Sequence, residues 1–367
     1  MESRQKIVIF LVAIAIVGIA SYVLFGKREM RKPIELNNKN QSLNVSTGPA
    51  NSGDVSPISG LPCADWNRRP VAVMQPADVP ARPAAGFSDA DMVVEMPVIT
   101  ASVTRLMAVY VCGNPDDVGS MRSSRHDFIS LAKGLDAIYV SWGGSHFAKE
   151  KLNEGVIDNM NCNNDGGKSA AQYCYRKEVG KDGIVRGVDT GYAKFAKLLE
   201  GAKDFGYRLE NKFSGYKHAP EVALENRPKG GHLRVAFAGP FAAEYDYDRD
   251  TNSYLRTWGN VPDIDRNNKK RNAPKNVIVL MAQSEQIEGQ YNNVQLGDPW
   301  YDTTDSGDAF YYMNGEQKRG TWKKDKSDIQ SKLNFFDESG NEVTFVPGQM
   351  WVEVLEPGQT LRWEPVN

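Results

Sequence analysis

Two short segments of the sequence concentrate the side chains that could bind a ligand or do chemistry. The first spans residues 118–127 (VGSMRSSRHD), where Arg122, Ser123 and Arg125 stand just before an expected helix. Guanidinium groups bind carboxylate or phosphate, and the N–H groups at a helix N-terminus add further donors. The segment therefore predicts an anion site. The alternative is that these arginines only pair with buried carboxylates such as Glu95.

The second segment is WGGSH at residues 142–146, directly after the apolar run DAIYV at residues 136–140. A strand, a glycine turn and a helix start would place Gly143, Gly144 and Ser145 at the carboxyl end of a sheet, where open α/β folds bind ligands. Two glycines fall short of a phosphate-loop or dinucleotide fingerprint. A tight turn with Ser145 as the helix cap is therefore the alternative interpretation.

Hydrolytic chemistry is a second possibility for the same segments. Ser123 or Ser145 could serve as a nucleophile, with His126 or His146 as the base. The sequence contains no G-x-S-x-G elbow and no SxxK pair around these serines. We therefore assign no catalytic residue and expect a binding role rather than an enzymatic one.

The four cysteines, Cys63, Cys112, Cys162 and Cys174, indicate a compartment rather than a metal site. They form no CxxC pair, and no histidines stand at ligand spacing, so we expect neither a metal nor a cofactor. An even number of cysteines outside the cytoplasm favours disulfides. The spacing alone leaves their pairing open.

A hydrophobic segment near the N-terminus predicts a membrane anchor. Residues 7–25 carry no charge, and at about 1.5 Å per residue a helix of this length crosses a hydrocarbon core of roughly 30 Å. A cleavable signal peptide, cut before Ser21, is the alternative. We expect an uncleaved anchor over residues 1–32, followed by a flexible stalk over residues 33–57 that is rich in Asn, Ser and Gly.

Two signals disagree about which side of the membrane holds the body. Positive charges at residues 27–32 outnumber those before the hydrophobic run, which would place the body in the cytoplasm. The cysteines favour the outside, and we therefore expect a single-pass protein of the cell membrane with an extracytoplasmic body. The formal net charge of -2 indicates no nucleic-acid partner.

The body is expected to have a mixed α+β fold in two domains. Residues 58–228 predict an α/β domain, because apolar strand-like runs alternate with helical spacing. The expected strands are 70–74, 91–95, 104–111 and 136–140, and the expected helices are 125–133, 148–153 and 190–205. Residues 229–367 contain short β-like runs separated by turn signals such as Asn314-Gly315, which predict a mostly antiparallel β domain.

Several of these segments together resemble the YerB-like family of cell-surface lipoproteins, whose domains have no assigned function. The resemblance rests on residues 69–74, 81–83, 89–91, Glu95, 104–105, 118–119, 122–125, 136–140, 143–145, 276–279 and 320–323. It implies an α/β N-terminal domain joined to a β-rich C-terminal one, exported and held at the membrane. The chain departs from the family in having no lipobox cysteine after its hydrophobic run, and in having His126 where a proline usually follows Arg125.

The matching positions favour a polar site built from Glu95, Arg105, Arg122, Arg125 and Asp136. In this hypothesis the chain binds an anionic or sugar-containing cell-envelope ligand: Arg122 and Arg125 hold a carboxylate or phosphate, Arg105 supports them, and the two acids orient the guanidinium groups. A cell-envelope polymer or a membrane protein would be the partner. The alternatives are an envelope hydrolase with a Ser/His pair, and a structural partner protein whose polar cluster is only a buried network.

Overall fold

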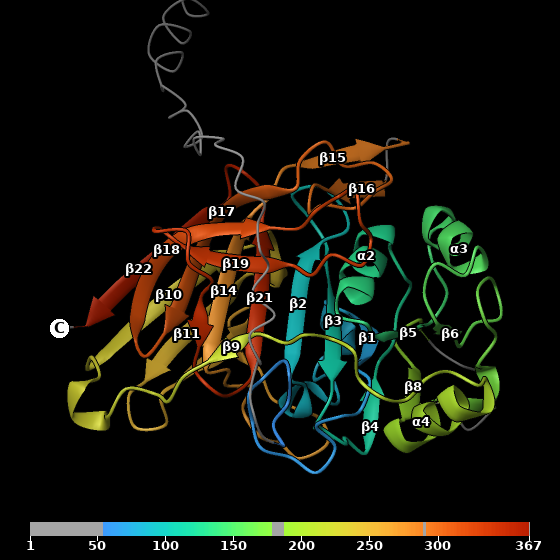
Figure 1. Cartoon of the computed structure of the whole chain (residues 1–367), viewed down its shortest axis with the longest axis horizontal. Helices are drawn as coiled ribbons and strands as arrows, with labels where there is room; N and C mark the ends of the chain where they lie inside the picture. The colour runs from blue at the N-terminus through green and yellow to red at the C-terminus, as the bar shows by residue number, and fades with distance from the viewer. Residues whose placement is uncertain (1–53, 178–186, 289–290, 367) are drawn as a thin grey trace, which may run out of the picture. The chain divides into compact units, whose positions relative to one another are not determined.

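A ten-stranded mixed sheet runs through the protein in our computed structural model, which describes residues 54–177, 187–288 and 291–366 (Figure 1). In spatial order its strands are β19 (Asn334–Asp337), β18 (Glu316–Lys323), β17 (Ser306–Met313), β14 (Asn276–Met281), β21 (Met350–Leu355), β2 (Met92–Pro97), β3 (Thr104–Tyr110), β1 (Val71–Pro76), β5 (Ile138–Ser141) and β6 (Asn159–Asn161). This sheet positions both segments that the sequence singles out.

Smaller sheets and short helices surround it. A five-stranded sheet has the order β13 (Val261–Pro262), β12 (Ser253–Trp258), β11 (Ala243–Asp248), β10 (Gly230–Ala236) and β22 (Thr360–Val366). The remaining strands form a triplet, β4 (Asp117–Gly119), β8 (Gly191–Lys194) and β7 (Cys174–Arg176), and two pairs, β15 (Ser284–Ile287) with β16 (Tyr291–Val294) and β20 (Thr344–Phe345) with β9 (Lys217–His218).

The described residues contain three α-helices and five 3-10 helices. The α-helices are α2 (His126–Gly134), α3 (His146–Asn153) and α4 (Phe195–Asp204). The 3-10 helices are η1 (Val79–Ala81), η2 (Phe87–Asp89), η3 (Ala171–Tyr173), η4 (Leu224–Asn226) and η5 (Gly239–Phe241).

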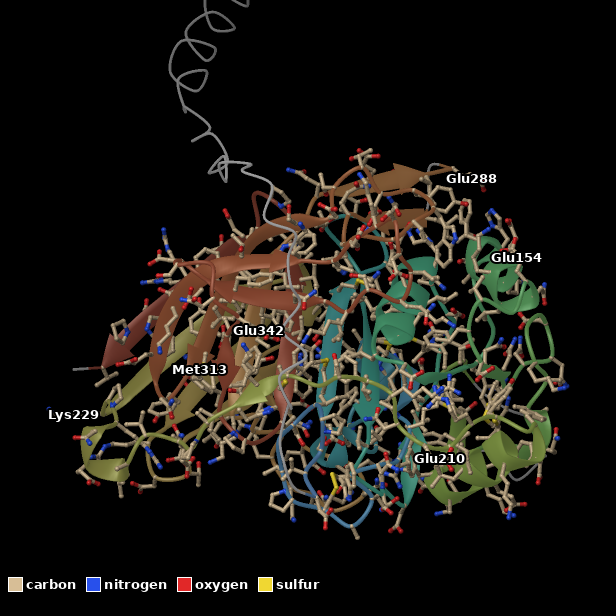
Figure 2. All side chains as sticks on the ribbon, viewed as in Figure 1. Glu154, Glu210, Lys229, Glu288, Met313 and Glu342 are labelled. Carbon is tan, nitrogen blue, oxygen red and sulfur yellow. A yellow bond between two sulfur atoms is a disulfide. The ribbon has the colours of Figure 1, made fainter. Side chains whose placement is uncertain are left out.

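The central strands β1, β2, β3 and β21 are buried along their whole length and mostly apolar, because both faces of the ten-stranded sheet are covered. Along β1, Ala72 and Met74 belong to one hydrophobic cluster and Val71 and Val73 to the other, as the two-residue period of a strand requires. The first cluster includes side chains of α2 and α3, and the second includes those of α4 and the five-stranded sheet. Side chains occupy the space between these layers (Figure 2).

The N-terminal and C-terminal halves of the chain meet within this sheet. Strand β2 pairs with β21 in parallel, with Met92 opposite Met350 and Glu95 opposite Glu353. The expected fold class, an α/β domain joined to an antiparallel β domain, is therefore wrong. The described chain is mostly β with three α-helices, and a second sheet packs together with α4 against one face of the large sheet. The domain boundary at residues 228–229 stays a prediction.

Individual elements agree better with the sequence. The apolar runs at 70–74, 91–95 and 104–111 correspond to β1, β2 and β3, and Asn314-Gly315 turns between the paired strands β17 and β18. The expected helix at 190–205 is partly wrong. Its first residues form β8, which pairs with β4 and β7, and the helix α4 starts only at Phe195.

The predicted transmembrane anchor is not supported by the described part of the chain. Residues 7–25 lie outside it, and no described helix is both long enough and apolar enough to span a bilayer. The described end of the predicted stalk, residues 54–57, is packed against the body. There Ser56 is buried, and its hydroxyl accepts hydrogen bonds from the backbone N–H groups of Ile58 and Ser59.

The prediction of disulfides is confirmed, and the structure supplies their pairing. Cys63 bonds to Cys112, with 5.8 Å between the Cα atoms, and Cys162 bonds to Cys174, with 5.9 Å. The first bridge ties the start of the body to the end of β3. The second closes a short loop beyond β6.

Candidate functional site

The two segments singled out in the sequence lie side by side beyond the end of β5. The backbone N–H of Ser124 donates to the carbonyl of Gly143 at 2.8 Å, and the N–H of Ser145 donates to the carbonyl of Ser124 at 3.2 Å. The N–H of Trp142 donates to the carbonyl of Arg122 at 3.0 Å. The chain thus brings residues 121–125 and 142–145 together, and each segment continues into a helix, α2 or α3.

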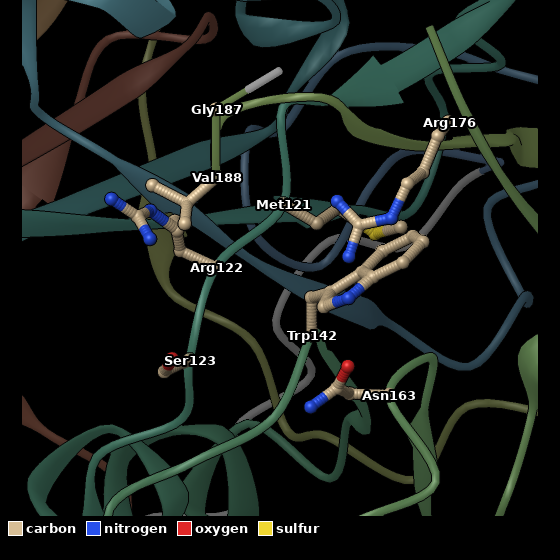
Figure 3. Close-up of a pocket in the computed structure, with 8 residues that line it drawn as sticks. All are labelled: Met121, Arg122, Ser123, Trp142, Asn163, Arg176, Gly187 and Val188. Carbon is tan, nitrogen blue, oxygen red and sulfur yellow. The ribbon is translucent and has the colours of Figure 1, made fainter. Parts of the chain in front are cut away.

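A pocket of about 440 Å³ opens beside these segments (Figure 3). Its lining consists of Met121, Arg122, Ser123, Trp142, Asn163, Arg176, Gly187 and Val188. The Arg176 guanidinium lies over the Trp142 ring, 4.6 Å from its centroid, and donates to the Thr190 hydroxyl at 2.9 Å. Figure 3 shows the Arg122 guanidinium on the other side of the pocket, next to Val188.

Sequence reasoning missed four of these lining residues: Asn163, Arg176, Gly187 and Val188. Asn163 directly follows Cys162, and Arg176 lies two residues after Cys174, so the disulfide between the two cysteines fixes both relative to the pocket. The N–H of Cys162 also donates to the carbonyl of Ser141 at 2.9 Å, which ties the loop to the end of β5. A partial signal was present in the sequence, since Asn163 and Arg176 lie close to cysteines that were expected to form disulfides, but the spacing left the pairing of those cysteines open.

Positive charge is only partly neutralised around the pocket. Arg122 forms ion pairs with Asp189 at 2.9 Å and with Asp78 at 3.5 Å. Arg105 and Arg125 form none with any described residue, and their guanidinium groups donate to the backbone carbonyls of Ser123 and Ser124 at 3.1 and 2.9 Å. Of the four arginines at or beside the pocket, which include Arg176, only Arg122 forms ion pairs with described residues.

The pKa values of these arginines reflect their crowding. Burial lowers the pKa of Arg105 to about 9, and the charges of Arg125 and Arg122 act in the same direction. Burial likewise lowers the pKa of Arg125. Arg105 is 6% exposed, and its buried Nε atom has no hydrogen-bond partner in the part of the chain that the structure describes. An anion bound close to these cations would offset the effects of burial and repulsion, because an opposite charge favours the charged form of a guanidinium group.

Glu95 lies elsewhere, between the two large sheets. One of its carboxylate oxygens accepts from the Thr104 hydroxyl at 2.6 Å, and the other accepts from the Arg256 guanidinium at 2.5 Å. Glu95 and Arg256 are both fully buried. The structural alternative, a buried network, therefore describes the surroundings of Glu95.

Asp136 is also outside the pocket. It has a positive φ of 58°, forms an ion pair with Arg208, and accepts from the backbone N–H of Lys212 at 2.9 Å. Its own carbonyl accepts from the Arg69 guanidinium at 2.7 Å. These contacts hold together the start of β5 and a later loop.

Gly143, Gly144 and Ser145 build the turn beside the pocket and do not line it. Gly143 has a φ of 78°, which favours glycine, and its N–H donates to the Asn161 side chain at 2.8 Å. The Ser145 hydroxyl caps α3 by accepting from the N–H of Ala148 at 3.2 Å. This role matches the capping alternative.

No histidine among the described residues hydrogen-bonds to Ser123 or Ser145. The His126 ring is 1% exposed and contacts Asn293 and Asp127, and the exposed His146 ring contacts Glu288 at 3.1 Å. The pair of groups that a serine hydrolase needs is therefore not assembled in the described structure.

Comparisons with known proteins agree with the resemblance seen in the sequence. The curated protein "Putative lipoprotein YerB" of Bacillus subtilis (strain 168) is 27% identical over 305 residues, covering 82% of this chain and 86% of that protein. The crystal structure of the YerB protein from Bacillus subtilis superposes with a TM-score of 0.69 at 25% identity, covering 82% of this chain and 96% of the other.

Family models give the same result. The model described as "Protein of unknown function (DUF3048) N-terminal domain" matches residues 58–208, and the model of the corresponding C-terminal domain matches residues 233–352. Together the two matches span most of the chain. The chain therefore belongs to the DUF3048 family, and the YerB-like resemblance is confirmed.

Proposed function

We propose that this chain is an extracytoplasmic, membrane-associated protein that binds an anionic, sugar-containing cell-envelope ligand in the pocket between Arg122 and Arg176. Its similarity to a protein named as a putative lipoprotein supports membrane association outside the cytoplasm. The two disulfides agree with this location, because disulfides persist in oxidising compartments.

The observation that supports anion binding is the excess of guanidinium groups at the pocket. Two aspartates compensate Arg122, whereas Arg105 and Arg125 have no ion pair with any described residue. Arg176 also lines the pocket, where its guanidinium group contacts the Trp142 ring and the Thr190 hydroxyl. Guanidinium forks suit carboxylate and phosphate, so an acidic group is the chemistry that this lining recognises.

The rest of the lining suits a polar molecule of moderate size. A volume of about 440 Å³ lies within the range of small-molecule sites, roughly 300 to 1,000 Å³. Ser123 and Asn163 offer a hydroxyl and an amide for hydrogen bonds to hydroxyl groups, and Trp142 offers an aromatic edge. This combination supports a sugar or a phosphosugar unit of a larger envelope polymer.

The test uses calorimetric titration of the purified protein with anionic wall-polymer fragments that carry phosphate or carboxylate. Arg176→Ala and Arg122→Ala should each weaken binding by roughly 10- to 100-fold, because each removes a charge-assisted hydrogen bond to the ligand. Binding should also weaken as salt increases, since the attraction is partly screened.

Arg362→Ala is the matched control, because Arg362 is 69% exposed on the edge strand β22 and pairs only with Glu364 among the described residues. It should bind like the unmodified protein. A neutral oligosaccharide of the same length should bind at least roughly tenfold more weakly than the anionic fragment. Equal affinities for both fragments, or unchanged affinity in Arg176→Ala and Arg122→Ala with intact folding, would refute the proposal.

A further inference from the structure

A second polar cluster lies under the arm formed by β15, β16 and the loop that follows, where the arm contacts α2. Nε2 of His126 lies 3.3 Å from Oδ1 of Asp127 and 3.8 Å from Oδ2 of Asp298. The His126 side chain is 1% exposed, and the two aspartate side chains are each 2% exposed. We propose that these three residues bind a zinc ion, with the side-chain oxygen of Asn293 nearby as a fourth ligand.

The unpartnered oxygen of Asp298 is the observation that points to an ion. Its Oδ1 atom accepts from the backbone N–H groups of Trp300 and Tyr301 at 2.7 and 2.9 Å. Its Oδ2 atom is buried, has no hydrogen-bond partner among the described residues, and faces the ring of His126. A buried carboxylate oxygen without a partner is costly, and a cation at this point would remove that cost.

The donor atoms select the kind of ion. One imidazole nitrogen and two carboxylate oxygens lie within 4.8 Å of one another. Zinc binds such ligands at about 2.0 to 2.2 Å in a tetrahedron, in which ligand atoms lie roughly 3.3 to 3.5 Å apart. The 3.3 Å between His126 and Asp127 already fits, and the 3.8 Å between His126 and the Asp298 oxygen exceeds this range by only a few tenths of an ångström. Calcium prefers six to eight oxygen ligands, which this cluster does not offer.

The surrounding hydrogen bonds hold the ligands in place. Asn293 Oδ1 lies 2.9 Å from Nε2 of His126, and its amide group donates to Asp302 at 3.2 Å. Asp302 also accepts from the N–H of Asp298 at 2.8 Å, and Asp127 accepts from the N–H of Val294 at 3.0 Å. Such outer contacts orient the ligands of metal sites.

A zinc ion here would fasten the arm to α2. Two ligands belong to the first turn of α2, and the others come from the arm, so the ion would bridge segments far apart in the sequence. The site is closed to solvent, as structural zinc sites are. Because His126 directly follows Arg125, the ion would also fix the end of the arginine segment, although zinc binding does not depend on the function proposed above.

The test measures zinc binding to the full-length protein after removal of metals with EDTA. The unmodified protein should bind one zinc ion per chain and unfold at a higher temperature with zinc, because the ion binds only the folded state. Asp298→Asn keeps the acceptor for Trp300 and Tyr301 but loses the charge, and it should reduce the affinity by roughly 100-fold and abolish the thermal shift.

The exposed pair His232 and Asp246, 2.7 Å apart, supplies the matched control. Asp246→Asn should bind zinc like the unmodified protein, because a surface pair lacks further ligands. Retention of zinc affinity in Asp298→Asn, or an equal loss in Asp246→Asn, would overturn the proposal. Absence of zinc binding and of a zinc-dependent thermal shift in the unmodified protein would overturn it whether or not the variants fold.

Discussion

At the scale of single residues, a buried arginine organises the interface between the two large sheets. Arg256 on β12 pairs with Glu95 at 2.5 Å and with Asp263 at 2.7 Å, and its Nε atom donates to the Tyr245 hydroxyl at 3.1 Å. The Tyr245 hydroxyl in turn donates to Glu353. Such a network favours one specific packing of the sheets, because Arg256 without its acidic partners would be an uncompensated buried charge.

Glu353 gives this network a dependence on pH. Burial, assisted by the charge of Glu95, raises the pKa of Glu353 to about 8 from an ordinary value of 4.5. The folded protein therefore keeps this proton at a pH where the unfolded chain has released it. The stability contribution is complete below the ordinary pKa and is lost as the pH rises toward the raised one.

We therefore expect Glu353→Gln to flatten the pH dependence of stability. Between about pH 5 and pH 8, the free energy of unfolding of the unmodified protein should fall by on the order of a few kcal/mol more than that of the variant. Urea unfolding at several pH values measures the difference between the two proteins. Glu364→Gln on the edge strand β22 is the control, and equal slopes for Glu353→Gln and the unmodified protein would contradict the expectation.

Residue types located part of the candidate site from sequence alone. Arg122 and Ser123 line the pocket, and Arg105 and Arg125 lie beside it. The sequence could indicate these four residues because three of them belong to one short segment and Arg105 belongs to an expected strand. Glu95 and Asp136 could not be assigned correctly. Their partners, Arg256 and Arg208, lie far away in the sequence, and only the folded chain brings them together.

At the scale of elements, the two disulfides have different roles, one mainly in stability and the other in the position of pocket residues. The Cys63–Cys112 bridge closes a loop with a sequence separation of 49, and the Cys162–Cys174 bridge closes one of 12. In the chain-entropy description a longer loop gives more stability. The shorter bridge instead holds Asn163 and Arg176 at the pocket.

Replacing each pair of cysteines by serines should therefore separate stability from binding. We expect the Cys63/Cys112 variant to lose the larger share of stability, roughly 4 kcal/mol against roughly 3 kcal/mol for the Cys162/Cys174 variant. The order should reverse for affinity toward an anionic wall fragment, with the Cys162/Cys174 variant losing more. Chemical unfolding and calorimetric titration measure the two quantities, and affinity losses of equal size would count against the assigned role of the shorter bridge.

Strands were easier to predict than their pairing. Apolar runs marked β1, β2 and β3, and Asn314-Gly315 marked the hairpin of β17 and β18, because local sequence determines both signals. The parallel pairing of β2 with β21 has no local signal. The sequence therefore predicted a separate α/β domain where the chain forms one shared sheet.

At the scale of the whole molecule, the shared sheet couples the two family regions. Strand β21, near the C-terminus, lies between β2 and β14, so removing it would expose an edge on each side. The apolar clusters on both faces also combine residues from the two regions. Neither region has a complete core of its own.

We expect the body to unfold in one cooperative step. In differential scanning calorimetry, the calorimetric and van't Hoff enthalpies should agree to within roughly 10 to 20%, which is the test for a two-state transition. Two separated transitions, or a ratio well above one, would show that the regions unfold independently despite their common sheet.

The exposed edge strand of the five-stranded sheet affects how copies of the protein interact when they lie close together. Its outermost strand, β22, displays Arg362 and Glu364 with side chains 69% and 47% exposed. The unpaired backbone groups of an edge strand can form hydrogen bonds with a strand of another chain, and charged side chains on the edge strand oppose this pairing. Copies of the protein held close together on a surface can therefore meet at this edge without forming intermolecular strand pairs, and neighbouring molecules stay separate.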